Sequence, residues 1–311
     1  MDEVLFLEST VVDKPYGGTR LHELFGVGKA DEKIGEYWVI SGHDHGPGKV
    51  INGTYKGQLL KDVYQKHREL FANDTHEKFP LLIKLNQAAQ PVSVQVHPSN
   101  EQRPGEGKAE FWLFLEAKPG SRIIHGHTAK TKEELKEKIE QKDWQDLLVY
   151  QDIHTGDCIF NPPGMIHGQE ADDVMCEVQQ SSDTTYRIYD YDRLFDGRPR
   201  QLHQKQAIDV TTVPSLDVEV HPVKEEENGN IIIHYLDNEF FRITGYQVRN
   251  EVKIQNPKYS LLVVLNGSGT IETEQESYSI HAGMGIVVTS LTSSYALKGN
   301  MNVLSSETGN Q

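Results

Sequence analysis

Short runs of apolar residues, or of alternating apolar and polar residues, recur along almost the whole chain, with Gly, Pro and Asn between them. Runs of this length predict short β-strands joined by turns, the pattern of a β-sandwich or a β-barrel. The clearest predicted strands span residues 37–41, 81–85, 92–97, 111–116, 174–179, 231–235, 240–248, 260–265 and 285–289. We therefore expect a mainly β protein.

Three segments follow a helical period instead. Apolar residues between positions 59 and 71 recur at helical spacing. Thr131 begins a capping box, and apolar residues follow it four positions apart, which predicts a helix within residues 129–149. We expect this charged segment to be a helical excursion on the outside of the β structure, and a third helix to cover residues 202–210.

A turn-rich, acidic segment at residues 214–229 marks a predicted domain boundary. The first domain would span residues 1–218, and a smaller β domain would span residues 219–311. The smaller domain has the strand and turn pattern of a second barrel, but it offers only His281 and no cluster of metal ligands. We interpret it as a structural or dimer-related domain.

Composition and charge restrict the partners of the protein. The chain has 311 residues and a formal net charge of −15. A surface this acidic repels nucleic acid and anionic lipid, so we expect neither as a partner. No apolar run approaches the roughly 20 residues that span a bilayer, and the acidic N-terminus does not resemble a secretory signal. The only two cysteines, Cys158 and Cys176, fit a reducing cytoplasm and are expected to be small core residues.

Polar residues on one face of a predicted strand form the first part of a candidate metal site. Residues two apart on a strand share a face, so Ser93, Gln95 and His97 lie together, opposite three valines. Lys108 and Glu110 share a face of the next strand in the same way. Buried polar atoms need partners, and an interior lined with metal ligands would explain a polar face inside a barrel.

A turn motif supplies the last candidate ligand. From Gly156 the sequence reads Gly-x5-Pro-x-Gly-x2-His and ends at His167. This pattern predicts a β-hairpin with a tight Pro-Gly turn and a histidine at the start of its second strand. With Gln95, His97 and Glu110, His167 completes a mixed nitrogen and oxygen set that suits Zn²⁺, at bond lengths of about 2.0–2.2 Å. Mn, Co or Fe(II) would also fit, and the spacing alone also allows a structural turn with a core histidine.

Two other histidine pairs are rivals for a metal. His43 and His45 lie in a loop rich in Gly, Asp and Pro, which is typical of a solvated turn. His125 and His127 run straight into the predicted helix start, away from any carboxylate on a strand. We expect neither pair to form the metal site.

Basic residues near the candidate ligands point to an anionic substrate. An arginine inside a barrel is costly unless it is paired or binds an anion, and Arg187 lies on a predicted strand. The alternative for Arg187 is a surface ion pair with Asp190, which contributes little. Lys108 should also point inward, as should Lys84, for which the alternative is a charge that protects an edge strand. Three inward cations beside a metal would suit a phosphorylated, hydroxylated substrate.

Four segments together resemble the type I mannose-6-phosphate isomerases, in particular the short form of Gram-positive bacteria. They are the Gln-x-His-Pro strand at 90–98, the Lys-Ala-Glu triplet at 108–110, the Pro-Gly-Met-Ile-His turn at 163–167 and Ser-Asp-Thr-Thr-Tyr-Arg at 182–187. The resemblance covers nearly the whole chain. It implies a cupin (jelly-roll) barrel with helical insertions and a second, smaller cupin-like barrel. Gln95 stands where many cupins have a first histidine, as expected in this family.

The resemblance also implies a cofactor and a reaction. One Zn²⁺ per subunit would be held by Gln95, His97, Glu110 and His167. The reaction would be the reversible interconversion of mannose 6-phosphate and fructose 6-phosphate through a cis-enediol. We expect a cytoplasmic monomer or weak homodimer whose partner is this small sugar phosphate.

Roles for the remaining candidates follow from the resemblance. Arg187 matches the active-site arginine of the family, and we expect it to act in catalysis with Lys108, while Ser93, Lys84 and Asp190 bind the substrate. The general base stays open among a metal-bound water, Lys108 and a carboxylate such as Asp190. Two other functions stay open: an Fe or Mn cupin oxygenase, which would usually carry a His-x-His pair before its glutamate, and a non-catalytic sugar-binding cupin.

Overall fold

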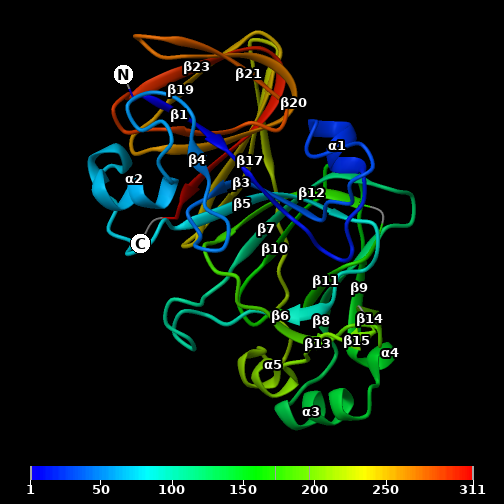
Figure 1. The fold of residues 1–311 in the computed structure, drawn as a ribbon. Coiled ribbons are helices and arrows are strands. Elements are labelled where there is room, and N and C mark those ends of the chain that lie inside the picture. Colours follow the sequence, from blue (N-terminus) through cyan, green and yellow to red (C-terminus); the bar gives the residue numbers. More distant parts are fainter. Residues whose placement is uncertain (1, 172, 196, 310–311) are drawn as a thin grey trace.

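The strand-forming runs of the sequence assemble into three large β-sheets stacked along the molecule (Figure 1). The computed structural model describes residues 2–171, 173–195 and 197–309. Within them, a ten-stranded sheet built mainly from the C-terminal third lies at one end, a six-stranded sheet lies in the middle, and a five-stranded sheet lies near the helices at the other end. All nine predicted strands overlap observed strands, so the mainly β prediction is confirmed.

The spatial order of the strands within each sheet differs from their order along the chain. The ten-stranded sheet contains, in spatial order, β16 (Val223–Glu227), β17 (Asn230–Asp237), β18 (Phe241–Val248), β23 (Ser294–Thr308), β20 (Ser260–Glu272), β22 (Gly285–Val288), β1 (Val4–Glu8) and β4 (Lys49–Val50), with β19 (Glu251–Gln255) and β21 (Ser277–His281) at its side. The six-stranded sheet contains β10 (Cys158–Asn161), β7 (Glu110–Ala117), β12 (Asp173–Gln180), β5 (Leu81–Ala88), β3 (Glu36–Ser41) and β2 (Thr10–Val12). The five-stranded sheet contains β13 (Tyr186–Tyr189), β6 (Val94–Val96), β11 (His167–Gln169), β8 (Arg122–His127) and β9 (Leu148–Asp152). A two-stranded ribbon contains β14 (Leu194–Phe195) and β15 (Arg198–Pro199).

The predicted helices are present, with one interruption. The segment 59–71 forms α2 (Leu60–Lys66) and then a 3₁₀ turn, η1 (Arg68–Phe71), because the backbone at His67 leaves the helical region at φ −133° and ψ 57°. The other helices are α1 (Arg20–Phe25), which the sequence pattern did not predict, α3 (Lys132–Glu140), α4 (Trp144–Leu147) and α5 (Gln204–Val210). The predicted cap of α3 is confirmed, since Thr131 Oγ1 accepts a hydrogen bond from the backbone N–H of Glu134 at 3.1 Å.

Two strands complicate the predicted boundary between the domains. Part of the turn-rich segment 214–229 forms β16, an exposed strand at the edge of the ten-stranded sheet that was not among the clearest predicted strands. Its run of glutamates masked the strand, although charges are common on exposed edges. In addition, β1 pairs with β22, so the first strand of the chain belongs to the C-terminal sheet. The division into 1–218 and 219–311 stays a prediction.

The largest core lies between the six-stranded and the ten-stranded sheets. Fully buried side chains of this core include Ile83, Leu85, Phe111, Cys176 and Val178 from the former and Leu5, Leu261, Val263 and Leu304 from the latter. Each such side chain contributes roughly 1.5–3 kcal/mol through its burial. This core fixes the six-stranded sheet firmly from one side, and Cys176 is one of its small members, as expected.

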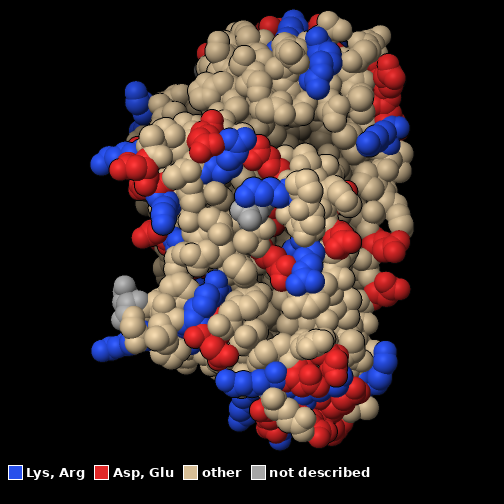
Figure 2. Space-filling view, turned by 90° about the vertical axis from the view of Figure 1, so that its right-hand side faces the viewer, with Lys and Arg blue, Asp and Glu red and all other residues tan. Residues whose placement is uncertain are grey.

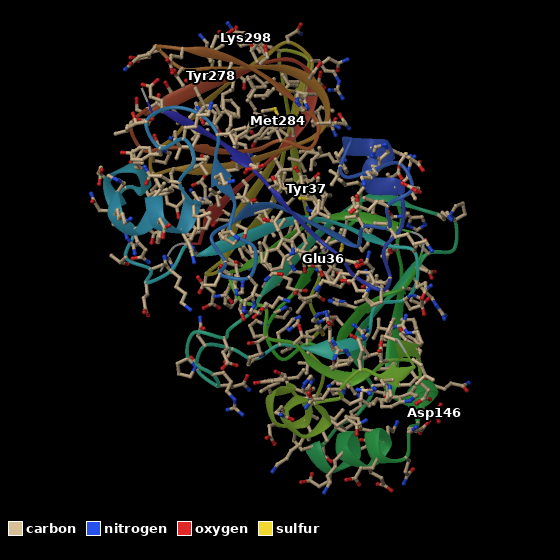
Figure 3. All side chains as sticks on the ribbon, viewed as in Figure 1. Glu36, Tyr37, Asp146, Tyr278, Met284 and Lys298 are labelled. Carbon is tan, nitrogen blue, oxygen red and sulfur yellow. The ribbon has the colours of Figure 1, made fainter. Side chains whose placement is uncertain are left out.

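The opposite face of the six-stranded sheet is polar and faces the five-stranded sheet. Successive side chains of a strand point to opposite faces, and Glu36 and Tyr37 on β3 show this alternation (Figure 3). Tyr37 packs against the apolar core, whereas Glu36 is buried on the polar side. The space between these two sheets therefore collects polar groups.

Charged residues are spread over the outside of the molecule. Figure 2 shows acidic and basic side chains interspersed on one face, most densely at the lower end, where α3 and α4 lie outside the sheets. The prediction of an external helical excursion is thus confirmed. Among the described residues, no helix combines the length and the apolar character needed to cross a bilayer.

Candidate active site

Three candidate metal ligands converge between the six-stranded and five-stranded sheets. The ligand atoms of His97, Glu110 and His167 lie within 4.8 Å of one another, and all three side chains are buried. Glu110 Oε1 is 3.1 Å from His97 Nε2, and Glu110 Oε2 is 3.4 Å from His167 Nε2. His97 directly follows β6, Glu110 opens β7 and His167 opens β11, so the two sheets bring the three residues together from distant parts of the chain.

Strand register places Gln95 and Arg187 beside these ligands. Arg187 on β13 pairs with Gln95 on β6, which in turn pairs with His167 on β11. Residues directly opposite each other on antiparallel strands point to the same face, so the three side chains form one row. Gln95 Nε2 lies 3.4 Å from His167 Nε2. A rotation of the Gln95 amide by a half-turn would place its Oε1 where Nε2 now lies, next to His167 Nε2.

The turn before His167 is a corner between two sheets, and the predicted hairpin was wrong. β10 pairs with β7 in the six-stranded sheet, whereas β11 pairs with β6 and β8 in the five-stranded sheet. The Pro-Gly motif specifies a tight turn, but it does not specify which strands pair on either side. Gly164 has a φ of 85°, and a Cβ added there would lie 2.4 Å from Thr212 Oγ1. Its backbone N–H donates a hydrogen bond to the His97 carbonyl at 2.9 Å.

Hydrogen bonds at Nδ1 leave Nε2 of both histidines free to bind a metal. Nδ1 of His97 is 2.8 Å from the Thr184 carbonyl, and Nδ1 of His167 is 2.9 Å from the Met165 carbonyl. A carbonyl only accepts, so each Nδ1 carries the proton and each Nε2 keeps a free lone pair toward Glu110. Burial, with Lys108 nearby, lowers the pKa of His97 to about 3. Burial also lowers the pKa of His167. Both rings are therefore neutral, the form that binds metals.

The carboxylate between the histidines also fits a cation. Oε1 of Glu110 is buried and accepts no hydrogen bond of regular geometry, although Lys108 Nζ lies 2.9 Å from it. A buried carboxylate oxygen needs a positively charged or hydrogen-bonding partner. The donor set of two Nε2 atoms, this carboxylate and the Gln95 amide therefore fits a divalent ion with open coordination positions.

The rival pair His43 and His45 forms a hydrogen-bonded cluster. Their ring nitrogens and the Asp183 carboxylate also lie within 4.8 Å of one another. However, Nδ1 of His43 accepts a hydrogen bond from the backbone N–H of His45 at 3.2 Å. The proton of the neutral His43 ring then lies on Nε2, which faces Asp183 at 3.7 Å as a donor. The one remaining lone pair of His43, on Nδ1, is taken by the N–H of His45, so this ring offers no free nitrogen to a metal.

The second rival pair lies on a strand that ends at His127, shortly before the helix that Thr131 caps. His125 and His127 both belong to β8, and His125 pairs with His167 in the same row of side chains. Nε2 of His125 lies 3.3 Å from the Phe160 carbonyl, and Nε2 of His127 lies 2.9 Å from the Thr212 carbonyl. Both Nε2 atoms therefore act as donors, and neither histidine joins a metal-ligand group among the described residues.

Lys84 lies deep between the sheets. Its strand, β5, lies between β12 and β3, so the alternative of an edge-strand charge was wrong. Lys84 Nζ is 3.0 Å from Glu177 Oε2 and 4.0 Å from Glu36 Oε2. Burial acts to lower the pKa of Lys84, but Glu177 and Glu36 outweigh it and raise the pKa above its usual value. Lys84 is thus a buried, charged residue with two carboxylate partners.

Arg187 is held by neutral groups. Its Nε donates to Ser93 Oγ at 3.2 Å, and its Nη1 donates to the Gln201 carbonyl at 2.8 Å. The surface pair considered for Arg187 and Asp190 does not form, because Asp190 pairs with Arg193 and Arg200 at 2.6 Å each. Burial, and then the charge of Arg200, lowers the pKa of Arg187.

One cavity connects these groups. Its wall includes Ser93, Gln95, Lys108, Lys84 and Arg187 from the predicted set, together with Lys14, Tyr16, Glu36, Asn86, Trp112, Glu177 and Arg200. Asp190 stands behind Arg200 and is not part of this wall. The alternation used for β6 also applies to Glu36, Asn86 and Glu177 on β3, β5 and β12, but it does not show that these strands face the ligands. Lys14 and Arg200 lie in irregular segments and carry no periodic signal.

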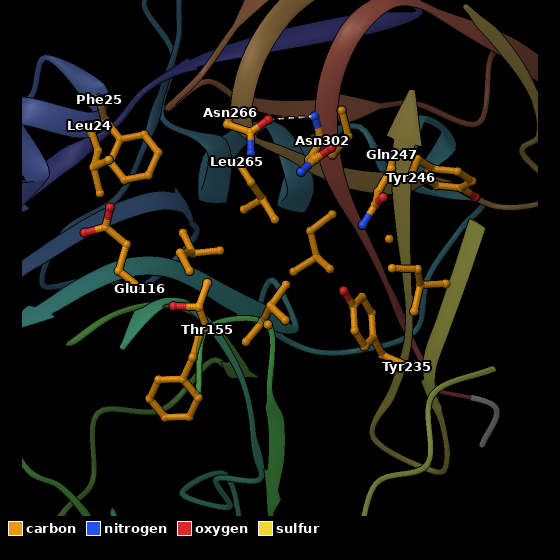
Figure 4. Close-up of a pocket in the computed structure, with 18 residues that line it drawn as sticks. Leu24, Phe25, Glu116, Thr155, Tyr235, Tyr246, Gln247, Leu265, Asn266 and Asn302 are labelled. Carbon is orange, nitrogen blue, oxygen red and sulfur yellow. Dashed lines mark hydrogen bonds between the residues drawn. The ribbon is translucent and has the colours of Figure 1, made fainter. Parts of the chain in front are cut away.

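A second hollow lies on the other side of the six-stranded sheet, beneath the C-terminal sheet (Figure 4). Its lining is largely apolar, with Leu24, Phe25 and Tyr235 among its members. Its one acidic residue, Glu116, is bound by Arg20 at 2.6 and 2.7 Å. Neither metal-ligand group found in the described part of the chain lies there, so the chemistry belongs to the cavity beside His97.

The fold and the site place the protein in the class of β proteins that can hold a metal ion between two sheets. Comparisons with known proteins narrow this class. Residues 4–110 match the family Phosphomannose isomerase type I, catalytic domain, and residues 231–308 match the family Mannose-6-phosphate isomerase, cupin domain. The chain is 39% identical to the mannose-6-phosphate isomerase of Streptococcus mutans, over 98% of both chains. It therefore belongs to the type I phosphomannose isomerase family, and the resemblance seen in the sequence is confirmed.

Solved structures agree with this assignment. The crystal structure of the mannose 6-phosphate isomerase from Bacillus subtilis superimposes with a TM-score of 0.94 at 34% identity, and the match covers 98% of this chain and 100% of that one. A zinc-bound mannose 6-phosphate isomerase shares the fold, with a TM-score of 0.80 at 14% identity, over 99% of this chain and 100% of that one. The predicted cupin fold is thus supported by both the family and the structures.

Proposed function

We propose that this protein is an isomerase that interconverts mannose 6-phosphate and fructose 6-phosphate with one Zn²⁺ bound by Gln95, His97, Glu110 and His167. The observation that carries the proposal is that Gln95 and Lys108, which each lie 3.4 Å from a ring nitrogen of the ligand cluster, also line a cavity with basic residues. Such a cavity suits a sugar bearing a phosphate, since arginine and lysine form charge-assisted hydrogen bonds to phosphate. The relatives at 35–39% identity named as mannose-6-phosphate isomerases support the same reaction.

The reaction needs proton transfer between two neighbouring carbons. Interconverting an aldose and a ketose removes a proton from C2 or C1 and leaves negative charge on oxygen, as in a cis-enediolate. A divalent ion in the His97, Glu110 and His167 cluster would supply Lewis-acid stabilisation of that charge. Arg187 lies in the same row of side chains as Gln95 and is placed to stabilise the developing charge from the side.

Lys108 is positioned at the edge of the ligand cluster. Its Nζ is 2.9 Å from Glu110 Oε1 and 3.4 Å from His97 Nε2. It adds positive charge where the oxygens of the substrate would meet the ligands. Ser93 holds Arg187 through its hydroxyl, and Lys84 adds a buried charge farther along the wall. Catalytic roles for Arg187 and Lys108, and substrate-binding roles for Ser93 and Lys84, remain part of this proposal.

The surroundings of Asp190 and Glu177 narrow the choice of the general base. Burial acts to raise the pKa of Asp190, but the hydrogen bonds from Arg200 and Arg193 outweigh it and hold the pKa below its usual value. A carboxylate that is weakly basic and outside the cavity wall is poorly suited to remove a proton. Glu177 lines the cavity, and burial raises the pKa of its carboxyl, which makes it a stronger base than a free glutamate. Glu177 therefore joins Lys108 and a metal-bound water as a candidate base.

A coupled assay for fructose 6-phosphate formation from mannose 6-phosphate tests the proposal. The purified protein should turn over, lose activity when a chelator strips the metal, and regain activity with added Zn²⁺. Mn²⁺ and Co²⁺, added in parallel, would identify the preferred ion. An absence of chelator-sensitive turnover would favour the non-catalytic sugar-binding or oxygenase alternatives. Whether the protein is a monomer or a weak homodimer stays a prediction.

A further inference from the structure

Asn161 is a buried side chain whose amide has no hydrogen-bond partner. It ends β10 and is only 1% exposed. Among the described residues, neither its Nδ2 nor its Oδ1 is hydrogen-bonded, whereas Asn86 and Gln179 lack a partner for the oxygen alone. An amide buried in this way is costly unless it finds a partner. The surroundings of Asn161 must therefore explain why an asparagine is present.

The turn that follows Asn161 does not explain the residue. Asn161 directly precedes Pro162 and the corner that leads to His167. Asparagine is common at such turns because its side chain can hydrogen-bond to the backbone of the turn. The Asn161 amide makes no such bond in the described part of the chain. Asparagine is also uncommon within strands, so neither the turn nor the strand accounts for it.

Strand pairing places Asn161 beside Glu110, the carboxylate of the ligand cluster. Asn161 on β10 pairs directly with Glu110 on β7. Residues paired in this way point to the same face of a sheet, with their Cβ atoms about 4.5–5.5 Å apart. The preceding residue, Phe160, points the other way and joins the apolar core. The Asn161 side chain thus lies on the face of the six-stranded sheet that carries the ligands.

Asn161 lies outside the cavity that would receive a substrate. β10 is at one edge of the six-stranded sheet, and Asn161 is not part of the cavity wall. The wall residues Trp112, Glu177 and Lys84 come from β7, β12 and β5, the strands that follow β10 across the sheet. Any effect of Asn161 on the reaction must therefore pass through the ligand cluster.

Glu110 can accept more hydrogen bonds than it receives. Its Oε2 accepts one from Trp112 Nε1 at 3.1 Å, and its Oε1 accepts none of regular geometry, although Lys108 Nζ lies 2.9 Å from it. The two oxygens of a carboxylate offer about four lone pairs, so a bound metal ion leaves others free. Carboxylates that bind a metal are usually hydrogen-bonded by neighbouring groups. The unused N–H groups of Asn161 lie one strand away.

We propose that Asn161 is a positioning residue of the metal centre, and that its amide N–H donates to the Glu110 carboxylate when this carboxylate binds the metal ion. The inference rests on the proposed function and deepens it, because it names a residue that sets the affinity of the metal site. The buried amide is costly in the protein without the ion and gains a partner when the ion binds. Asn161 should thus lower the stability of the zinc-free protein and strengthen its binding of zinc.

The variants Asn161→Val and Asn161→Thr separate hydrogen bonding from side-chain shape. Valine removes the donor, so the zinc Kd of the purified protein, measured by competition with a chelator, should rise about 10–100-fold. The Tm of the zinc-free variant should exceed that of the zinc-free wild type, because an apolar side chain replaces an unpartnered amide. Threonine has the shape of valine but keeps a hydroxyl donor, so its Kd should lie between those of the valine variant and the wild type.

Asn230→Val is the matched control. Asn230 is also 1% exposed, but it lies in the ten-stranded sheet, and its amide is hydrogen-bonded at both ends. Its Nδ2 donates to two backbone carbonyls at 2.9 and 3.0 Å, and its Oδ1 accepts from two backbone N–H groups. Valine there should lower the Tm and leave the zinc Kd unchanged. A zinc-free Tm that falls in Asn161→Val as well would make Asn161 a structural residue and overturn the proposal.

Zinc binding also separates this inference from the proposed function. A wild-type zinc Kd in Asn161→Val would overturn the role of Asn161 and leave the isomerase intact. Weaker zinc binding in Asn161→Val, in a protein whose wild type does not isomerise mannose 6-phosphate, would support the role and refute the reaction. A wild type that binds no zinc would overturn both. If Asn161→Val does not fold, Asn161→Ala, which adds no volume, replaces it with the same expected rise in Kd.

Discussion

The backbone N–H of Gly164 donates a hydrogen bond to the carbonyl of His97 at 2.9 Å. This bond joins the corner that carries His167 to the end of the strand that carries His97. The corner is packed closely, since a Cβ at Gly164 would lie 2.4 Å from Thr212 Oγ1 and 3.2 Å from the Val210 carbonyl. The relative position of two candidate ligands therefore depends on a residue without a side chain.

We expect Gly164→Ala to destabilise the protein and to weaken its binding of metal. An alanine at positive φ costs about 1–2 kcal/mol, and the contact with the 210–212 segment adds about 1–3 kcal/mol. Gly156→Ala is the control, because Gly156 also has a positive φ, 94°, but has open space around its Cβ position. Urea unfolding and zinc content should show the larger loss in Gly164→Ala; equal losses in both variants would contradict the steric argument.

Replacement of His97 or His167 by Gln should remove most of the bound metal. Each ring offers Nε2 to the cluster and is oriented by a carbonyl at Nδ1. The loss should exceed the roughly 10–100-fold effect seen when only a supporting partner of a ligand is removed. His125→Gln is the control, because His125 lies in the same row but its Nε2 faces a backbone carbonyl. Full metal content and activity in His97→Gln would refute the ligand assignment.

Arg187→Ala should depress turnover while leaving the metal in place. Removal of one group that stabilises developing charge costs about 10²–10³-fold in kcat at comparable sites. Ser93→Ala should have a smaller effect of the same kind, because it removes only the 3.2 Å bond that holds Arg187 Nε. Activity and zinc content are measured on the same preparation. Loss of metal from Arg187→Ala would count against a catalytic role.

Glu36 should make the free energy of unfolding decrease at acidic pH. It accepts hydrogen bonds from Tyr16 and Trp38 at 2.7 Å each. Burial acts to raise the pKa of Glu36, but Lys84, Lys14 and these hydrogen bonds lower it to about 2, against 4.5 for a free side chain. Between these values the unfolded chain binds more protons than the folded one, so stability falls as the pH falls.

The expected loss of stability from protonation of Glu36 can be measured by urea unfolding at several pH values. Glu36 should account for roughly 1 kcal/mol of lost stability by pH 4, and for about 3 kcal/mol once the pH is below both pKa values. Urea midpoints at pH 7, 5 and 4 should therefore fall less steeply for Glu36→Gln than for the wild type. Glu226→Gln, on the exposed strand β16, should keep the wild-type slope. Parallel slopes for Glu36→Gln and wild type would show that the ion pairs of Glu36 contribute little.

The sequence predicted those parts of the site that lie on regular strands. Alternation along residues 92–97 placed Gln95 and His97 on one face because side chains of a strand repeat every two residues. The same rule placed Lys108 with Glu110, and the structure shows them 2.9 Å apart. The rule also applies to Glu36, but nothing in the sequence indicated which strand would face the ligands across the cavity.

Other features depend on contacts between distant segments. The Pro-Gly motif predicted the turn before His167 but could not show that its two strands enter different sheets. Arg200 lies in an irregular segment, and its position in the cavity wall is held by a carboxylate ten residues earlier whose direction no pattern reveals. The direction of the Asp190 side chain was hidden for the same reason, since sequence proximity to Arg187 does not show which way a side chain turns.

The pairing of β1 with β22 has a consequence for biosynthesis. Val4, Leu5 and Phe6 emerge from the ribosome about 280 residues before their partners Ile286, Val287 and Val288, by the spacing of these positions in the sequence. Until then the first strand has no neighbour on that side, and an unpaired apolar strand is prone to aggregate. A nascent chain that stalls shortly before residue 286 should therefore depend on chaperones, because β1 still lacks its partner β22.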